Sequence, residues 1–203
     1  MLIKICGLTD IAETEYLKRN KVDFCGMVLF FEKSKRNITI EKAKEIMAAL
    51  GDEIKPVAVV VSPSMEQVHQ IEDAGFSYIQ IHGQCEEAVF KECKLPILKA
   101  FNVSDMDKYQ YYLSFSSVKG FVFDAGEPGS GNTFDWDMLK SLKLDDSHIH
   151  LLAGGLNPSN VSKAIEAVGL IDGVDVSSGV EYTDRLGKNP DLVDSFVAAV
   201  RGC

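Results

Sequence analysis

Long hydrophobic runs are absent from this sequence of 203 residues, since no stretch approaches the roughly 18–20 consecutive apolar residues that a membrane-spanning helix needs. The first residues, MLIKICGLTD, also lack the apolar core and the small-residue cleavage site of a secretory signal, and they have the pattern of a β-strand instead. We therefore expect a soluble, cytoplasmic protein that has no membrane partner.

Positive charge is scarce as well, because 21 Lys and Arg residues face 30 Asp and Glu residues and the formal net charge is −9. A protein this acidic is a poor partner for nucleic acid, whose phosphates repel it. The same balance sets a condition on function. If the substrate is an anion, its site must be made locally positive by Arg, Lys or backbone N–H groups.

Paired cysteines are missing too. The chain has five cysteines, an odd number, and no C-x-x-C spacing occurs. The count gives no indication of a disulfide framework or of a zinc site, so we expect free thiols and no metal ion.

What the sequence does have is a regular alternation of apolar, β-rich segments with amphipathic helical segments. Eight strands are expected, at Leu2–Cys6, Phe24–Phe30, Pro56–Val61, Tyr78–His82, Ile97–Phe101, Gly120–Ala125, His148–Gly155 and Gly173–Gly179. The helices that follow them are expected at about Asp10–Asn20, Ile40–Leu50, Ser64–Ala74, Glu86–Cys93, Ser104–Leu113, Phe134–Leu142, Asn157–Ala167 and Asp191–Val200.

These eight units predict an α/β fold, a (β/α)₈ TIM barrel that forms a single domain over residues 1–203. Strands that are apolar on both faces, such as Val57–Val61, are typical of a parallel sheet covered by helices. An open doubly wound sheet is the structural alternative. No G-x-G-x-x-G follows the first strand, which disfavours that alternative further.

In a TIM barrel the active site lies at the C-terminal ends of the strands, so the residues just past each strand are the candidates for function. Two of the expected loops there are long, Phe31–Thr39 after the second strand and Gly126–Thr133 after the sixth. We expect these two loops to cover the substrate.

Cys6 ends the first expected strand and Asp124 ends the apolar part of the sixth, where barrel enzymes place catalytic groups. A thiolate is a competent general base, and a carboxylic acid kept protonated by a partly apolar site is a competent general acid. A cysteine in a strand can equally be a core residue, as we expect for Cys25. Asp124 has less structural reason to stand between FVF and a glycine-rich loop.

Two polar, glycine-containing loops follow the last two strands, and loops 7 and 8 form the usual phosphate site of these barrels. One contains Gly154 and Gly155, and the other contains Ser177, Ser178 and Gly179. Their backbone N–H groups meet the requirement for a locally positive site. We therefore expect a small phosphorylated substrate.

Three further side chains are candidates for the site. Arg36 can clamp a carboxylate or a phosphate, because a guanidinium binds both in a bidentate way, although a solvated basic loop is the alternative. His82 ends the fourth strand, where a structural role is at least as expected as a functional one. Lys4 shares strand parity with Cys6, so its side chain should also point into the barrel, where a lysine is costly unless it is paired. Asp175 on the eighth strand is the best candidate for its partner, and Gln80 or ordered water is the alternative.

Six segments, distributed from one end of the chain to the other, resemble phosphoribosylanthranilate isomerase of tryptophan biosynthesis. They are KICGLT at Lys4–Thr9, SKR at Ser34–Arg36, QIHG at Gln80–Gly83, GSGNTFDW at Gly129–Trp136, LAGGLNPSNV at Leu152–Val161 and VDVSSGVE at Val174–Glu181. They occur in the order of the family, and each belongs to a different position of the barrel.

The resemblance implies an Amadori rearrangement without metal or organic cofactor, in which Asp124 is the general acid and Cys6 the general base. Arg36 would hold the anthranilate carboxylate, the loops after strands 7 and 8 would bind phosphate, and Asp175 would lie near the sugar hydroxyls. Other tryptophan-pathway enzymes are possible partners, and the protein is expected to be a monomer or a homodimer.

Two rival functions remain open from the sequence. The related histidine-pathway aldose–ketose isomerase runs the same chemistry, but it uses an Asp where Cys6 stands and generally needs a second phosphate loop. A non-catalytic barrel that only binds phosphorylated metabolites is the other rival. Phosphate binding alone would require neither Cys6 nor Asp124.

Overall fold

The computed structural model describes residues 1–124 and 143–203, apart from the side chains of residues 103, 104 and 106. The expected covering loop Gly126–Thr133, the expected helix Phe134–Leu142 and the last residue of the sixth expected strand, Ala125, lie outside the described residues. Within the described part, no helix is long and apolar enough to cross a membrane.

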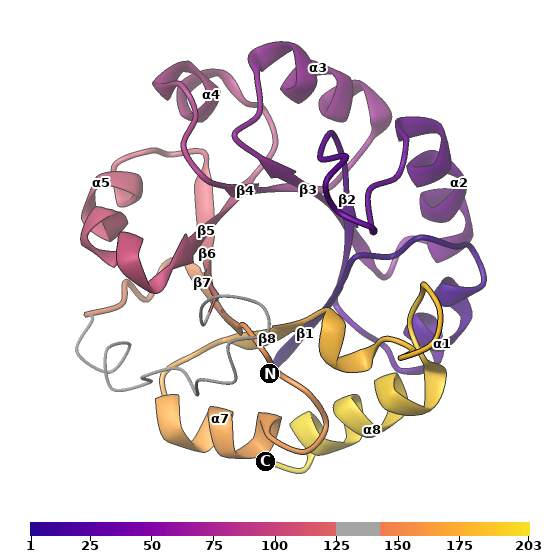
Figure 1. Cartoon of the computed structure of the whole chain (residues 1–203). Helices are drawn as coiled ribbons and strands as arrows, with labels where there is room; N and C mark the ends of the chain where they lie inside the picture. The colour runs from indigo at the N-terminus through magenta and orange to yellow at the C-terminus, as the bar shows by residue number, and fades with distance from the viewer. Residues whose placement is uncertain (125–142) are drawn as a thin grey trace.

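The strands of the described residues form one closed, parallel barrel in which each strand pairs with the next along the chain and the last pairs with the first (Figure 1). They are β1 (Leu2–Cys6), β2 (Phe24–Val28), β3 (Lys55–Val61), β4 (Tyr78–His82), β5 (Ile97–Asn102), β6 (Val118–Asp124), β7 (Ile149–Ala153) and β8 (Gly173–Val176). The TIM barrel prediction is confirmed. That the whole chain is a single domain stays a prediction.

Helices surround this barrel as an outer ring (Figure 1). The described helices are α1 (Glu13–Arg19), α2 (Ile40–Leu50), α3 (Met65–Ala74), α4 (Glu87–Glu92), α5 (Tyr109–Leu113), α7 (Val161–Val168) and α8 (Pro190–Arg201). Two short 3₁₀ segments, η1 (Val103–Lys108) and η2 (Ser178–Val180), precede α5 and follow β8.

Several helices begin where side chains satisfy the first backbone N–H groups. Ser64 and Gln67 form a reciprocal capping box at α3, and the Asn189 side chain accepts two N–H bonds at the start of α8. The expected start of the first helix at Asp10 is wrong by three residues, because Glu13 accepts the N–H groups of Thr9 and Asp10 and α1 begins at Glu13 itself.

β2, β7 and β8 end earlier than the sequence predicts. Backbone φ angles of +85° at Gly154 and +64° at Gly155 turn the chain out of the β region, so β7 ends at Ala153. Phe30 takes a φ of +56°, and β2 correspondingly ends at Val28. The shortening moves residues of the predicted strands into the loops at the C-terminal end of the barrel.

Alternation along the strands separates two apolar clusters. One fills the barrel interior and includes Phe24, Leu98, Val122 and Leu151. The larger cluster packs the outer faces of the strands against the helices. Every second residue of β1 therefore points inward, which places Cys6 in the interior cluster at the end of its strand.

Candidate active site

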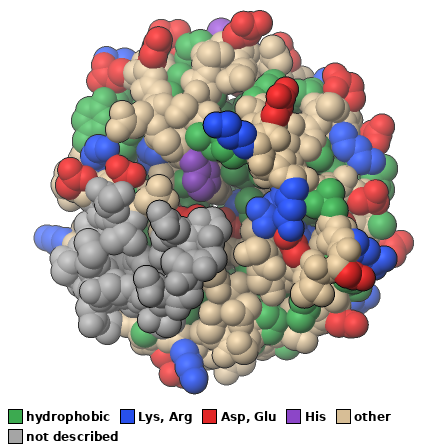
Figure 2. All heavy atoms as spheres, viewed as in Figure 1, with side chains coloured by type: hydrophobic (Ala, Val, Ile, Leu, Met, Phe, Trp, Pro, Cys, Tyr) green, Lys and Arg blue, Asp and Glu red, His purple; other side chains and the backbone are tan. Residues whose placement is uncertain are grey.

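Cys6, His82 and Asp124 are the last residues of β1, β4 and β6, so the structure brings all three to the C-terminal end of the barrel. Figure 2 views the molecule along the barrel axis, and basic side chains and a histidine lie around the centre of the face that it shows. This is the end at which TIM barrels place their active sites.

Cys6 is a buried residue with 9% exposure at the mouth of the barrel. Its carbonyl oxygen accepts a hydrogen bond of 2.9 Å from the Ser177 hydroxyl, which ties β1 to the start of the loop after β8. Burial raises the pKa of the Cys6 thiol, while the nearby ammonium groups of Lys4 and Lys188 lower it. The net shift is upward, so the resting side chain is a neutral thiol at neutral pH.

The ion pair expected between Lys4 and Asp175 is present, with 2.8 Å between Lys4 Nζ and Asp175 Oδ2. Lys4 and Asp175 are directly paired in the register of β1 and β8, and both are buried. Asp175 Oδ1 is buried without a hydrogen-bond partner in the described part of the chain. A buried acceptor of this kind is costly unless a ligand or water donates to it.

Arg36 contacts a carboxylate of the protein itself, that of Glu181, through Nε and through Nη2 at 3.1 Å. Lys35 Nζ and Lys188 Nζ lie 2.9 Å from the two oxygens of the same carboxylate. Three cations therefore surround one anion, and this cationic cluster has a net positive charge. It meets the condition that the acidic composition sets for an anionic substrate.

Burial raises the pKa of the Glu181 carboxyl, but its contacts with Arg36, Lys188 and Lys35 outweigh burial and bring the pKa to about 2. Lys188 is itself buried, and its ammonium also donates to the carbonyl oxygen and the hydroxyl of Ser177 at 3.2 Å each. The sequence alone does not indicate a role for Lys188, and for Glu181 it offers only a position at the end of the VDVSSGVE segment.

The loops after β7 and β8 approach each other closely. A Cβ atom at Gly179 would overlap the carbonyl oxygen of Leu156 and would lie 2.9 Å from Asn157 Cβ, so only glycine fits there. Gly154 and Gly155 turn the first loop, and Ser178 begins η2 in the second. The expected phosphate-binding residues are thereby brought together. The side chain of Ser177, however, is directed to Cys6 and Lys188.

His82 accepts a hydrogen bond at Nε2 from the Gln80 amide nitrogen, at 2.8 Å. Burial lowers the pKa of His82 to about 4, and the charges of Lys99 and Lys4 lower it as well. The imidazole is therefore neutral at physiological pH, which suits a hydrogen-bonding role better than a cationic one.

Asp124 is the last residue of β6. Its side chain belongs to the set of positions that face the barrel interior, and it is partly exposed. Its neighbours in the register are Asn102 on β5 and Ala153 on β7. The backbone of Asp124 thus lies between those strands at the barrel mouth. No three His, Cys, Asp or Glu side chains of the described residues gather as a metal site would require.

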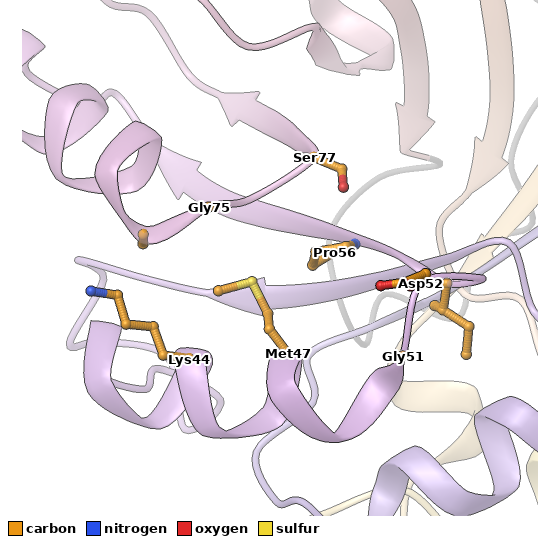
Figure 3. A pocket seen from close by; sticks show the side chains of 9 residues that line it. Lys44, Met47, Gly51, Asp52, Pro56, Gly75 and Ser77 are labelled. Carbon is orange, nitrogen blue, oxygen red and sulfur yellow. The ribbon is translucent and has the colours of Figure 1, made fainter.

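A cavity of about 330 Å³ lies at the other end of the barrel (Figure 3). Lys44 and Met47 of α2 line it together with Pro56 at the start of β3 and Gly75 after α3. The cavity thus lies beside the N-terminal ends of β3 and β4, away from Cys6 and the glycine-rich loops. We assign the active site by the convergence of chemical groups at the opposite end.

The chain is similar to known proteins along nearly its whole length. The family model described as N-(5'-phosphoribosyl)anthranilate isomerase matches residues 3–199 of the chain. The N-(5'-phosphoribosyl)anthranilate isomerase of Hyphomonas neptunium is 36% identical over 210 residues, which cover 98% of this chain and 96% of that protein.

Solved structures agree in fold over the whole chain. Phosphoribosyl anthranilate isomerase from Thermotoga maritima has a TM-score of 0.85 at 29% identity and covers all of both chains, and this dimeric enzyme has also been solved as monomers. A further phosphoribosyl anthranilate isomerase, in complex with reduced 1-(o-carboxyphenylamino)-1-deoxyribulose 5-phosphate, has a TM-score of 0.80 at 28% identity over the full length of both chains. The match of sequence and fold from end to end shows that this chain belongs to the N-(5'-phosphoribosyl)anthranilate isomerase family.

Proposed function

We propose that the chain catalyses the Amadori rearrangement of N-(5-phosphoribosyl)anthranilate to 1-(2-carboxyphenylamino)-1-deoxyribulose 5-phosphate, a step of tryptophan biosynthesis. One observation supports this most strongly. A cysteine and an aspartate, Cys6 and Asp124, stand at the C-terminal ends of two strands of a closed barrel whose sequence matches the isomerase family from residue 3 to residue 199.

The reaction needs one acid and one base. In our proposal the protonated carboxyl group of Asp124 gives its proton to the ring oxygen of the furanose, the C1–oxygen bond breaks, and the anilino nitrogen lone pair forms the iminium. The thiolate of Cys6 then removes the proton from C2. The electron pair of the broken C2–H bond forms the C1–C2 double bond and neutralises the iminium nitrogen, and the resulting enolamine tautomerises to the aminoketose. General acid and general base catalysis of this kind each contribute roughly 10²–10⁴-fold.

The two ends of the substrate are anions of different chemistry. The phosphate fits the loops that contain Gly154, Gly155, Ser178 and Gly179, through their backbone N–H groups. Because the Ser177 hydroxyl is already engaged, Ser177 contributes there through its backbone.

The anthranilate carboxylate is assigned to the free donors of Arg36, whose guanidinium is held by Glu181. The unpartnered Oδ1 of Asp175 is suited to accept a sugar hydroxyl, and neutral His82 is suited to bond the ribose or the ring. No cofactor enters this scheme. It stays a prediction that the protein is a monomer or a homodimer, that it is located in the cytoplasm, and that it contacts other tryptophan-pathway enzymes.

The decisive measurement is the decay of anthranilate fluorescence when phosphoribosylanthranilate is generated in the presence of the protein. We expect progressive turnover by the wild type and a loss of about 10²–10⁴-fold in kcat for Cys6→Ala and for Asp124→Asn, with the fold retained. Cys25→Ala and Asp52→Asn are the matched controls, because Cys25 faces away from the barrel interior and Asp52 lies at the opposite end.

Two results would contradict the proposal. A stoichiometric change in emission that does not progress would identify a binding protein rather than an isomerase. Retention of more than about a tenth of the wild-type kcat in either variant would mean that the role of that residue is wrongly assigned.

A further inference from the structure

Directly below Cys6, the barrel interior contains a charged pair that the acid and base steps do not use. Lys4 Nζ donates to Asp175 Oδ2 at 2.8 Å, and the Lys4 side chain has no exposed surface. Lys4 precedes Cys6 by two residues on β1, so both side chains point into the barrel. The ammonium therefore stands one layer beneath the thiol.

Gly26 on β2 shows how near the two groups are. It pairs with Cys6 in the strand register, and a Cβ atom placed on it would lie 2.7 Å from Cys6 Sγ and 3.1 Å from Lys4 Nζ. The thiol and the ammonium thus face the same small space, which the absence of a side chain at Gly26 leaves open. No other residue type at position 26 would leave both atoms where they are.

Among the described residues, hydrogen bonding uses only part of the donor capacity of Lys4. An ammonium has three donors, and Lys4 gives one of them to Asp175. Lys188, the other buried cation near Cys6, directs its donors to two oxygens of Ser177 and to Glu181. Lys4 is therefore the cation with donors to offer to a sulfur anion.

We propose that Lys4 is a positioning residue that stabilises the thiolate of Cys6 when the base forms, and that Asp175 tempers this effect by neutralising part of the lysine charge. The inference rests on the proposed function, because it takes Cys6 to be the general base. It explains how a buried thiol can act as a base.

The charges around Cys6 agree with this assignment. Burial raises the pKa of the thiol, Lys4 is the strongest influence that lowers it, Asp175 raises it and Lys188 lowers it. Burial lowers the pKa of Lys4, but Asp175 and Cys6 together raise it above its ordinary value, so the lysine stays charged. On the neighbouring strand β2, Cys25 faces outward and has a pKa of about 12 because it is buried.

The test measures the titration of Cys6 itself. The rate of alkylation by iodoacetamide, a neutral reagent, is followed against pH by mass spectrometry of the tryptic peptide that contains Cys6 and none of the other four cysteines. The variants are Lys4→Met, Asp175→Asn and the double variant. We expect Lys4→Met to raise the midpoint of the titration by about one pH unit or more and Asp175→Asn to lower it.

Opposite shifts distinguish charge from structural damage, which would move both variants in the same direction or neither. Lys4→Met leaves Asp175 as an unpaired buried carboxylate and could fail to fold for that reason. The double variant buries no unpaired charge and then takes the place of Lys4→Met. The double variant differs from Asp175→Asn only at Lys4, so its Cys6 thiol should titrate at a higher pH than the thiol of Asp175→Asn. Equal midpoints in that comparison would overturn the proposal.

Lys99→Met is the matched control, because Lys99 is also buried but donates to the carbonyl oxygens of Ile81, Gly83 and Ala100. Its Cys6 midpoint should equal that of the wild type. One limb of the isomerase pH profile should move together with the thiol midpoint in every active variant. If the midpoints shift as expected but the wild type shows no turnover, the proposed function is wrong and the electrostatic role of Lys4 stands.

Discussion

Arg36 contacts Glu181 through two of its nitrogens, and this contact fixes the plane of its guanidinium at the mouth of the barrel. A guanidinium has five N–H donors in a rigid fork, so a second carboxylate can still bind to it. Only a quarter of the Arg36 side chain is exposed. The Arg36 guanidinium therefore has a defined orientation before substrate binds.

Arg36→Ala should raise KM by about 10–100-fold and change kcat much less. A clamp on a carboxylate that does not react binds ground state and transition state alike, and hydrogen bonds to charged groups contribute about 1.5–3 kcal/mol. Steady-state kinetics provide the measurement. As a control, a substrate analogue without the carboxylate should bind wild type and variant equally. Unequal binding of that analogue would indicate that Arg36 contacts the phosphate or the reacting centre.

Glu181→Gln should lower the stability of the fold at pH 7, on the order of 3 kcal/mol, because it leaves buried Lys188 without its carboxylate. The pKa of the Glu181 carboxyl is about 2 in the folded protein, below its value of roughly 4.3 in an unfolded chain. Its ionised form therefore stabilises the fold above pH 4.3, and this contribution decreases as the pH falls towards 2.

Urea unfolding of wild type and variant between pH 7 and pH 3 measures this difference, which should narrow below about pH 4.5. Glu87→Gln is the control, because Glu87 pairs with Lys91 on the solvent-exposed surface of α4, where such pairs contribute little. A gap between wild type and Glu181→Gln that stays constant down to pH 3 would show that Glu181 does not stabilise the fold through its charge.

The sequence predicts some of these contacts and misses others for a physical reason. The Lys4–Asp175 pair could be predicted because strand parity and barrel closure together determine which inward side chains meet. The contact of Arg36 with Glu181 joins loops 145 residues apart, and no periodicity connects two loops. Lys188 lies in an irregular segment, where its burial could not be inferred from its neighbours.

At the scale of elements, the loops after β7 and β8 act as one unit because Gly179 lies against the backbone at Leu156. Gly179→Ala should separate them, since the added carbon would overlap the Leu156 carbonyl oxygen. We expect at least a 10-fold loss of affinity for the phosphorylated product, on the order of 1.4 kcal/mol, if these loops bind phosphate. Isothermal titration calorimetry with an analogue of the phosphorylated product measures this affinity.

Gly75→Ala is the control for that variant. Gly75 has a left-handed φ of +89° after α3 at the far end of the barrel, and an added carbon there would meet no atom within 4 Å. It should cost stability, about 1 kcal/mol, without changing affinity. If Gly179→Ala binds the product analogue as tightly as Gly75→Ala does, the two loops do not form the phosphate site.

Element boundaries show the limits of local patterns. β1 and β4 have the predicted bounds, because each short apolar strand is followed at once by a glycine with positive φ, Gly7 or Gly83. The fifth expected helix, from Ser104, is instead a 3₁₀ segment followed by α5, and the expected helix start at Asn157 is wrong because α7 begins at Val161. Before α7, the side chains of Asn157 and Asn160 accept backbone N–H groups of Ser159 and Asn157 and hold a turn, and hydrophobic periodicity does not register such local bonds.

At the scale of the whole molecule, the barrel is closed by the β1–β8 seam, where Leu2 pairs with Gly173. A Cβ atom at Gly173 would overlap the carbonyl oxygen of Leu2 and would lie 2.6 Å from Leu2 Cβ. Gly173→Ala should therefore strain the seam and lower the free energy of unfolding by about 1–3 kcal/mol.

The midpoint of urea unfolding measures this effect, with Gly202→Ala as the control. Gly202 lies at the end of α8, where an added carbon would be 3.4 Å from the Ala198 carbonyl oxygen and no strain is expected. If both variants unfold at the same urea concentration, then Gly173 is not required for close approach of the first and last strands.

The seam also has a consequence for how the protein acquires activity. Cys6 and Lys4 belong to the first strand, whereas Asp175 and Ser177 come from the last strand and the loop after it, more than 160 residues later. None of the partial barrels that can form during synthesis or refolding therefore contains the proposed base together with its surroundings. Helical content can return early, but turnover can return only when the ends of the sheet have met, so the recovery of activity reports ring closure itself.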